Sequence, residues 1–336
     1  MKEITEGDVT LRVPDVKMPE EGEVFYNPHM ALARDISVCI YSQLKGTLCD
    51  ALAASGVRGM RLAKDLDVTL NDANPGAVEL MKENLEMNGI EAEVTSLNAN
   101  RLLSERCFDI VDIDPFGSPV PFFDSACRSA KKMIGICATD TAPLAGNYPL
   151  VCKRRYMATP LKNEHFKENA VRILCGYAVR NAAKYDLSLK PVFVHATRHY
   201  FRAYLSVERG AKKANRTLQS VGTLEIKKKS FGPMWLGPLW EKSMVKGAIK
   251  ISEKREMAQL AELRRLLELI ENEMEREPFY FDYHKICSEI GVSPPPMTEI
   301  VEKSNGARTH FLDTGIKTEF GKEEFAELIR KRALKG

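Results

Sequence analysis

The sequence has no apolar run that approaches the roughly 20 residues of a membrane-spanning helix. Its first residues, MKEITEGDVT, contain no apolar segment of the kind that a signal peptide requires. These two absences disfavour membrane proteins and secreted proteins. We therefore expect a cytoplasmic protein with no membrane partner.

Paired cysteines are also missing, although the chain contains eight cysteines. None forms a CxxC pair, and several lie inside apolar segments such as SVCIY and IGICATD. His195 and His199 are four residues apart, but they lie in a strand-like segment and no third ligand is evident. The sequence therefore predicts small buried thiols in a reducing compartment, and neither disulfides nor a metal site.

A GxGxxG pattern is absent too, which disfavours a nicotinamide-dependent oxidoreductase. The net charge of +3 indicates little about partners. The charge distribution indicates more, because residues 209–255 carry twelve Lys or Arg against three Glu. This basic excess suits a nucleic-acid phosphate backbone, and it is equally typical of a solvated surface.

From about Gly46 to Leu205, short apolar strand-like runs alternate with helical patterns, which is typical of an α/β fold with a parallel sheet. Capping residues and apolar periodicity predict helices near residues 74–89 and 163–186. Seven candidate strands are predicted: residues 46–53, 68–72, 92–98, 108–114, 133–140, 191–198 and 201–207.

After about Glu208 the composition changes to a connection rich in Gly, Pro and aromatic residues, which includes GPMWLGPLW. Its prolines and aromatic residues, including Trp235 and Trp240, are predicted to form a hydrophobic anchor between the domains, with an RNA-stacking platform as the alternative. We expect a polar helix over residues 252–276, another helix starting near Asp282, and a short basic helix at the C-terminus. The sequence thus predicts two domains, a larger one over 1–208 and a second, smaller α+β domain over 209–336.

Three of the predicted strands end in polar segments that would meet at one edge of a parallel sheet. The turn DALAASGVRG, residues 50–59, combines small residues with an arginine and suits a ligand that bears a carboxylate. Asp72 lies at the end of the second strand, where an acidic side chain can accept both ribose hydroxyls of a nucleoside cofactor or cap the next helix. SLNAN, residues 96–100, can bond an adenine edge or simply form a turn.

The segment FDIVDIDPFGSP, residues 108–119, places Asp114 at the end of a buried strand, followed at once by Pro115 and Phe116. An exocyclic amine of a nucleobase is a poor nucleophile because its lone pair is delocalised into the ring. A carboxylate that accepts its N–H bonds can receive a proton as a methyl group transfers, and the aromatic ring offers a stacking face. The alternative role of Asp114 is to cap the following helix.

With these segments the chain resembles the tRNA (guanine-26 N2)-dimethyltransferase family, archaeal type. The resemblance implies a Rossmann-like, seven-stranded sheet that binds S-adenosylmethionine, and a second domain that helps to hold tRNA. It implies transfer of one and then a second methyl group to N2 of guanine 26, by a monomer without a protein partner. The similarity covers most of the chain and lies in seven segments: FYNPHMALARDIS, DALAASGVRG, NDANPGAVELMKENLEMNG, DIDPFGSPVPFFDSA, ATDTAPLAGNYPLVCKRRY, HYFRAYL and GPMWLGPLW.

The resemblance also implies roles for individual residues. Asp114 is expected to accept the guanine amine, with Phe116 and Phe25 on the two faces of the base, although packing in the core is an equal alternative for Phe25. The cofactor-binding residues are expected to be Arg34 and Arg58 near the methionine carboxylate, Asp72 on the ribose, and Asn98 with Ala99 around the adenine.

One feature of the sequence departs from the family pattern, and one buried acid has no partner that the pattern identifies. Archaeal-type relatives carry a two-CxxC zinc element before the GPLW segment, whereas SVGTLEIKKKSFGPMW has no cysteine. Asp112 lies two residues before Asp114 and needs a partner that the sequence does not name. The alternatives are methylation of another nucleobase or of a protein amide, and a cofactor-binding RNA chaperone without turnover.

Overall fold

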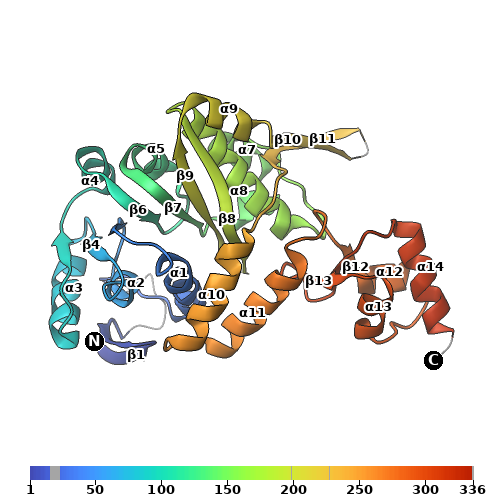
Figure 1. Ribbon diagram of the computed structural model, residues 1–336, viewed down its shortest axis with the longest axis horizontal. Helices are drawn as coiled ribbons and strands as arrows, with labels where there is room; N and C mark the ends of the chain where they lie inside the picture. The colour runs from blue at the N-terminus through green and yellow to red at the C-terminus, as the bar shows by residue number, and fades with distance from the viewer. Residues whose placement is uncertain (16–22, 198, 227, 335–336) are drawn as a thin grey trace.

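The computed structural model describes residues 1–15, 23–197, 199–226 and 228–334 (Figure 1). Its centre is a seven-stranded sheet of order β5-β4-β3-β6-β7-β9-β8, in which β9 is antiparallel to both of its neighbours. The strands are β3 (Thr47–Asp50), β4 (Asp67–Asn71), β5 (Glu93–Thr95), β6 (Phe108–Ile113), β7 (Ala130–Ala138), β8 (Leu187–Ala196) and β9 (Phe201–Arg209). All seven predicted strands are present; position 198, at the end of the sixth, lies outside the described residues.

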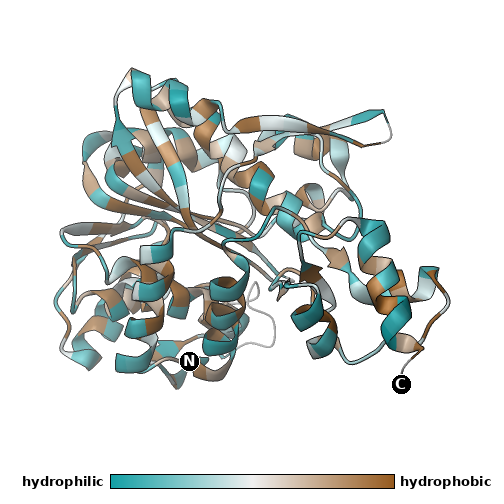
Figure 2. Cartoon of the chain, turned by 45° about the vertical axis from the view of Figure 1, so that its right-hand side comes forward, coloured by the Kyte–Doolittle hydropathy of each residue, from teal (hydrophilic) through white to brown (hydrophobic). Residues whose placement is uncertain are grey.

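The strand order places a topological switch point at β3, which pairs with β4 on one side and with β6 on the other. In open α/β sheets, ligands bind outside the carboxyl ends of the strands at such a point. The central strands are buried on both faces, as expected for parallel strands covered by helices. Figure 2 shows apolar residues along much of these strands.

The helices connect the strands and cover the sheet. Helix α3 shows why the sequence folds as it does: Asn74 caps its first turn, Pro75 opens it, and Gly89 ends it with φ of 59°. The helices of this part are α1 (Ala31–Tyr41), α2 (Val57–Leu62), α3 (Pro75–Asn88), α4 (Ala99–Glu105), α5 (Val120–Ser129), α6 (Thr141–Leu144), α7 (Pro149–Tyr156) and α8 (Phe166–Ala183), with the 3-10 helix Pro28–Met30 before α1.

Two further parts of the chain pack on this layer. An N-terminal hairpin, β1 (Lys2–Glu6) and β2 (Val9–Val13), lies beside α2 and α3. After the sheet come α9 (Ala211–Leu218), the hairpin of β10 (Val221–Ile226) and β11 (Lys229–Trp235), α10 (Lys242–Lys254) and α11 (Leu260–Glu273). Trp235 and Trp240 are buried in the core of the sheet, which confirms that they anchor this segment.

The prediction of one helix over residues 252–276 is wrong. The chain forms α10 and α11 instead, with a break between them at residues 255–259. The side chain of Asp35 on α1 accepts hydrogen bonds from the backbone N–H groups of Ala258 at 3.1 Å and of Gln259 at 2.7 Å. These bonds hold the connection just before α11, whose N-cap is Gln259, against α1, and α11 begins as a separate helix after it.

A second, smaller α+β part ends the chain and lies at the right of Figure 1. It has its own hydrophobic core, formed by Tyr283, Ile286, Cys287, Ile300, Ile316, Phe325 and Ile329. It contains the strands β12 (Phe281–Asp282), β13 (Ala307–Arg308) and β14 (Gly315–Lys317) and the helices α12 (Tyr283–Glu289), α13 (Met297–Lys303) and α14 (Lys322–Ala333). Apart from Ala214, the buried apolar residues of the segment 209–280 belong to the core of the sheet, and the division of the chain at 208/209 stays a prediction.

The cysteines and the lengths of the helices bear on the expected location of the chain. Cys107 is exposed, and the other seven cysteines are buried thiols. None of the helices in the described ranges is both long enough and apolar enough to span a membrane.

Candidate active site

A cavity of about 720 Å³ opens at the carboxyl ends of β3, β4 and β6. It brings together segments that are far apart in the sequence, from the N-terminal connection to the turn after β7. Six of the eight predicted site residues line it: Phe25, Arg34, Arg58, Asp72, Asp114 and Phe116. The cavity therefore lies where the sheet topology places a ligand.

The other two predicted residues do not line this cavity. Asn98 caps α4, where its side chain accepts a hydrogen bond from the backbone N–H of Asn100 at 3.0 Å. Ala99 follows it and is buried. Phe122 on α5 also lines the cavity, although no pattern in the sequence marks it as a site residue. The placement of Asn98 and Ala99 around an adenine remains a prediction.

Asp72 links two turns at the cavity wall. One of its carboxylate oxygens accepts from the backbone N–H of Ala54 at 2.9 Å, and the other accepts from that of Asn74 at 2.9 Å. Asn74 caps α3, so capping of that helix is not the task of Asp72. The turn after β3 continues into α2 through Gly56, whose φ of 79° suits glycine.

Arg34 is a buried residue of α1. Its Nε and Nη2 donate to the two carboxylate oxygens of Glu6, both at 2.6 Å, and Nη2 also donates to the Asn27 carbonyl at 3.2 Å. No bond to Nη1 is found within the described ranges, and Arg34 lines the cavity. Glu6 thus orients a guanidinium that retains one nitrogen for a ligand.

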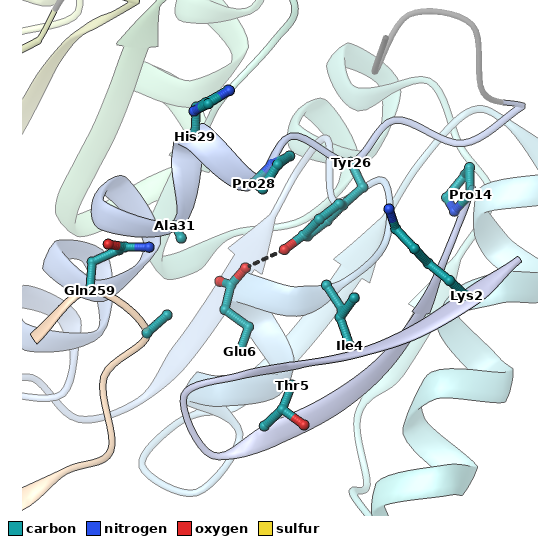
Figure 3. Close-up of a pocket in the computed structure, with 11 residues that line it drawn as sticks. Lys2, Ile4, Thr5, Glu6, Pro14, Tyr26, Pro28, His29, Ala31 and Gln259 are labelled. Atoms are coloured by element: carbon teal, nitrogen blue, oxygen red, sulfur yellow. Dashed lines mark hydrogen bonds between the residues drawn. The ribbon is translucent and has the colours of Figure 1, made fainter. Parts of the chain in front are cut away.

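Tyr26 separates this cavity from a second one of about 490 Å³, which is lined by residues of β1 and by His29 (Figure 3). The Tyr26 hydroxyl donates to Glu6 at 2.9 Å. Burial alone would raise the pKa of Glu6, but the Arg34 and Arg61 guanidiniums and Tyr26 outweigh it, so the pKa is lowered. Glu6 is therefore a fixed anion behind the cavity wall.

Three carboxylates and two guanidiniums form a buried cluster at the base of the cavity. Arg58 forms an ion pair with Asp114, and its Nη1 lies 3.4 Å from Asp112 Oδ1 and 3.7 Å from Asp50 Oδ1. Arg202 on β9 forms an ion pair with Asp112, and its Nη1 lies 3.5 Å from Asp114 Oδ2. Arg202 and Arg58 are thus the partners that Asp112 requires.

The pKa values of Asp114 and Asp50 in this acid–arginine cluster shift in opposite directions. Burial raises the pKa of Asp114, but Arg58 and Arg202 lower it more, to about 2, so Asp114 is ionised at neutral pH. Burial raises the pKa of Asp50 to about 7, because Arg58 offsets it only in part and Asp112 and Asp114 add to it.

This raised pKa predicts a pH dependence of stability. A carboxyl group whose pKa is higher in the folded protein binds more protons there, so its contribution to stability is lost as the pH rises from about 4 to about 7. Asp50→Asn cannot ionise, and we expect its free energy of unfolding to rise relative to that of the unsubstituted chain over this range. Urea unfolding of both proteins at several pH values measures the difference, and a constant difference would contradict the shift.

Arg202 was not selected from the sequence, although HYFRAYL offered a signal. An arginine within an apolar strand needs buried acids opposite it. Its Nε donates to the Tyr204 hydroxyl at 2.8 Å, and that hydroxyl forms a hydrogen bond with Ser37 Oγ at 2.9 Å. At the other end of β6, Asp109 accepts from the backbone N–H of Thr47 at 3.0 Å and has a structural role.

Two aromatic rings lie at the mouth of the cavity. Phe116 is 80% exposed and Phe25 is 36% exposed, which is unusual for phenylalanine. Their ring centroids are 5.9 Å apart and their planes meet at 63°, an edge-to-face contact. A planar base can enter between the two rings only after one of them turns aside.

His195 and His199, the two histidines whose spacing could suggest a metal site, lie in different environments. His195 is fully buried among aromatic rings, and burial holds its pKa well below its ordinary value. His199 is exposed, and its ring stacks on His29 with centroids 5.8 Å apart. In the part of the chain that the structure describes, no three His, Cys, Asp or Glu side chains are grouped so as to hold a metal ion.

The sheet order and the cavity at its switch point define a Rossmann-like α/β fold with a ligand site at the carboxyl ends of its strands. Residues 7–330 match the family model described as N2,N2-dimethylguanosine tRNA methyltransferase. The chain belongs to this family.

Individual relatives agree with this assignment. The chain is 40% identical to the tRNA (guanine(26)-N(2))-dimethyltransferase of Methanococcus maripaludis over 98% of both chains. It is 39% identical to the enzyme of the same name from Methanocaldococcus jannaschii over 97% of this chain and 98% of that one. Among solved structures, Trm1 from Pyrococcus horikoshii in complex with S-adenosyl-L-methionine has a TM-score of 0.90 and 36% identity, over 98% of this chain and 100% of that chain.

Proposed function

We propose that the chain transfers methyl groups from S-adenosylmethionine to the exocyclic N2 of guanine 26 in tRNA, giving monomethylguanine and then dimethylguanine. The observation that carries the chemistry is an ionised carboxylate, Asp114, at the mouth of a switch-point cavity beside the exposed ring of Phe116. Membership of the dimethylguanosine tRNA methyltransferase family supports the substrate.

The residues that line the cavity fit S-adenosylmethionine. The cavity is large enough for a nucleoside with an amino-acid tail, and its polar groups suit the parts of that molecule. Arg34 can bond the methionine carboxylate through Nη1, and Asp72 can accept the ribose hydroxyls. Asn98 and Ala99 are assigned to the adenine by resemblance. When bound, the cofactor supplies a methyl group made electrophilic by its sulfonium.

Arg58 takes a different role from the one that the resemblance implied. Its guanidinium already contacts Asp114, Asp112 and Asp50. We therefore propose that the main role of Arg58 is to balance the charge of Asp114, and that binding the cofactor carboxylate is secondary. By neutralising these acids, Arg58 keeps Asp114 an acceptor of hydrogen bonds.

Asp114 accepts N–H bonds from the guanine amine and holds its lone pair in line with the methyl carbon. The nitrogen–carbon bond forms as the carbon–sulfur bond breaks, and the amine proton leaves to Asp114 or, through it, to water. Because the pKa of Asp114 is about 2, the proton passes on to solvent rather than remaining on the carboxylate. Phe116 and Phe25 hold the base by stacking. A second cycle needs the singly methylated amine to present its remaining N–H to Asp114.

The larger assembly is also part of the proposal. We propose a cytoplasmic monomer in which residues 209–336 help to hold tRNA. Exposed cations of this segment, including Lys212, Lys213, Lys228 and Lys229, support phosphate contacts; Lys227 lies outside the described residues.

Methyl transfer from labelled S-adenosylmethionine to unmodified tRNA tests the proposal. The expected product is N2-methylguanosine followed by N2,N2-dimethylguanosine in hydrolysed tRNA, and a transcript with adenine at position 26 is the matched control. Label in another nucleoside would favour a different nucleobase amine, and label in protein alone would favour an amide substrate. Binding of tRNA without any transfer would indicate an RNA chaperone.

A further inference from the structure

The outer surface of α7 and the loop before it carries large apolar side chains in solvent. Tyr148 is 60% exposed, Leu150 78% and Met157 60%. The opposite side of the helix is packed in the core through Cys152 and Tyr156. Figure 1 labels α7 beside α8, against which it packs. Leu150 of α7 and the two residues that flank the helix, Tyr148 and Met157, are thus large apolar side chains in solvent, and such a group is a candidate contact surface.

The charge of this surface has one sign. Residues 141–162 contain Lys153, Arg154, Arg155 and Lys162 and no Asp or Glu, and all four cations are exposed. Arg155 lies 2.9 Å from Asp140. No ion pair of Lys153, Arg154 or Lys162 is found among the described residues, so their charges are available to a polyanion. Cations interleaved with an aromatic residue suit a nucleic-acid strand better than a protein surface.

Hydrogen bonds fix this surface to the active-site turn. The Tyr156 hydroxyl donates to Asp140 Oδ1 at 2.6 Å and forms a hydrogen bond with Ser118 Oγ at 2.9 Å. The backbone N–H of Gly117 donates to Thr139 Oγ1 at 2.6 Å. Hydrogen bonds therefore join α7 to the segment 114–118 and to Asp140, which line the cavity or adjoin residues that do.

We propose that this surface binds the strand of the RNA substrate next to the target guanine. The surface is named the α7 lip and consists of Tyr148, Leu150, Lys153, Arg154 and Met157. Lys153 and Arg154 contact its phosphates, and Tyr148 and Leu150 contact a base or ribose that is uncovered when the guanine leaves its stack. This inference rests on the proposed function. The α7 lip would be an RNA contact on the part of the chain that contains the seven-stranded sheet. It would act in addition to the phosphate contacts proposed for the basic segment after residue 209.

The test measures tRNA affinity by fluorescence anisotropy over a series of salt concentrations. For Lys153→Ala/Arg154→Ala we expect the slope of log affinity against log salt to fall by about 1–2, because two phosphate contacts are lost. For Tyr148→Ala we expect weaker binding by roughly tenfold at unchanged slope, because stacking carries no counterion release. Affinity for S-adenosylmethionine, measured by calorimetry, should remain that of the unsubstituted chain and shows that the variants are folded.

The matched control is Lys82→Ala/Lys131→Ala. These two lysines are also exposed, but they lie on α3 and at the first residues of β7, away from the carboxyl edge of the sheet. The control should keep the slope and the affinity of the unsubstituted chain. If all the variants had the tRNA affinity and the salt slope of the unsubstituted chain, and that chain still methylated tRNA, RNA binding by the α7 lip would be rejected. Absence of methyl transfer by the unsubstituted chain would instead reject the proposed function.

Discussion

Replacing Asp114 by alanine is expected to lower the rate of methyl transfer by about 10²–10⁴-fold, the range for loss of a positioned acid–base group. The variant loses the acceptor that directs the amine toward the methyl carbon, while the cavity walls that would hold the cofactor remain. The measurement is single-turnover transfer to tRNA, with the affinity for S-adenosylmethionine determined separately. Loss of turnover with both ligands still bound distinguishes an enzyme from a binding protein.

The control for this substitution lies on the same strand. Asp109 is near the start of β6 and bonds the backbone of Thr47, far from the cavity mouth that Asp114 reaches. Asp109→Asn should keep a hydrogen-bond acceptor there and leave the rate of transfer unchanged. Asp114→Asn should lose most of the rate, because its amide carries no negative charge and presents a donor to the amine. A fully active Asp114→Asn variant would contradict the role of the carboxylate.

The seven strands and the position of the cavity were predictable because both follow from local rules. Apolar runs separated by helical patterns specify a parallel sheet, and polar residues after such runs meet at its carboxyl edge. Asp72 and Asp114 end predicted strands and Phe116 lies two residues after one, so their convergence at one cavity required no knowledge of distant contacts. The same rule placed Asn98 at that edge, but its side chain turns to the backbone of α4.

The errors and omissions come from contacts between distant segments. Asp35 and the start of α11 are separated by more than 220 positions, and their hydrogen bonds divide what looked like one helix. Glu6 binds Arg34 from a hairpin that carries no recognisable motif. Arg202 reaches Asp112 across β7, which lies between β6 and β9. Sequence periodicity shows that a buried charge needs a partner, but it does not identify that partner.

The acid–arginine cluster gives the largest expected effect on stability. Arg202→Met removes the partner of Asp112, whose side chain is fully buried, and leaves Arg58 Nη1, at 3.4 Å, as its nearest guanidinium nitrogen. Breaking one side of a buried ion pair typically costs about 3–5 kcal/mol, because an uncompensated charge stays in the core. We expect a loss of this size in the free energy of unfolding by urea. Arg12→Met, which breaks an exposed pair with Glu3, is the control and should cost about 0–1 kcal/mol.

The double substitution Asp112→Asn/Arg202→Met separates charge from packing. If the cost of Arg202→Met is the unpaired charge of Asp112, removing that charge should restore a large part of the lost stability, and the double variant should be more stable than the sum of the two single variants implies. Urea unfolding of the three variants gives this coupling free energy directly. Additive losses would mean that Arg202 acts through its packing against Tyr204 rather than through Asp112. If the two substitutions are coupled, the ion pair between Arg58 and Asp114 is still present in the double variant. The double variant should then keep its affinity for S-adenosylmethionine. Arg202 would in that case support the carboxylates beneath the site without contacting the cofactor.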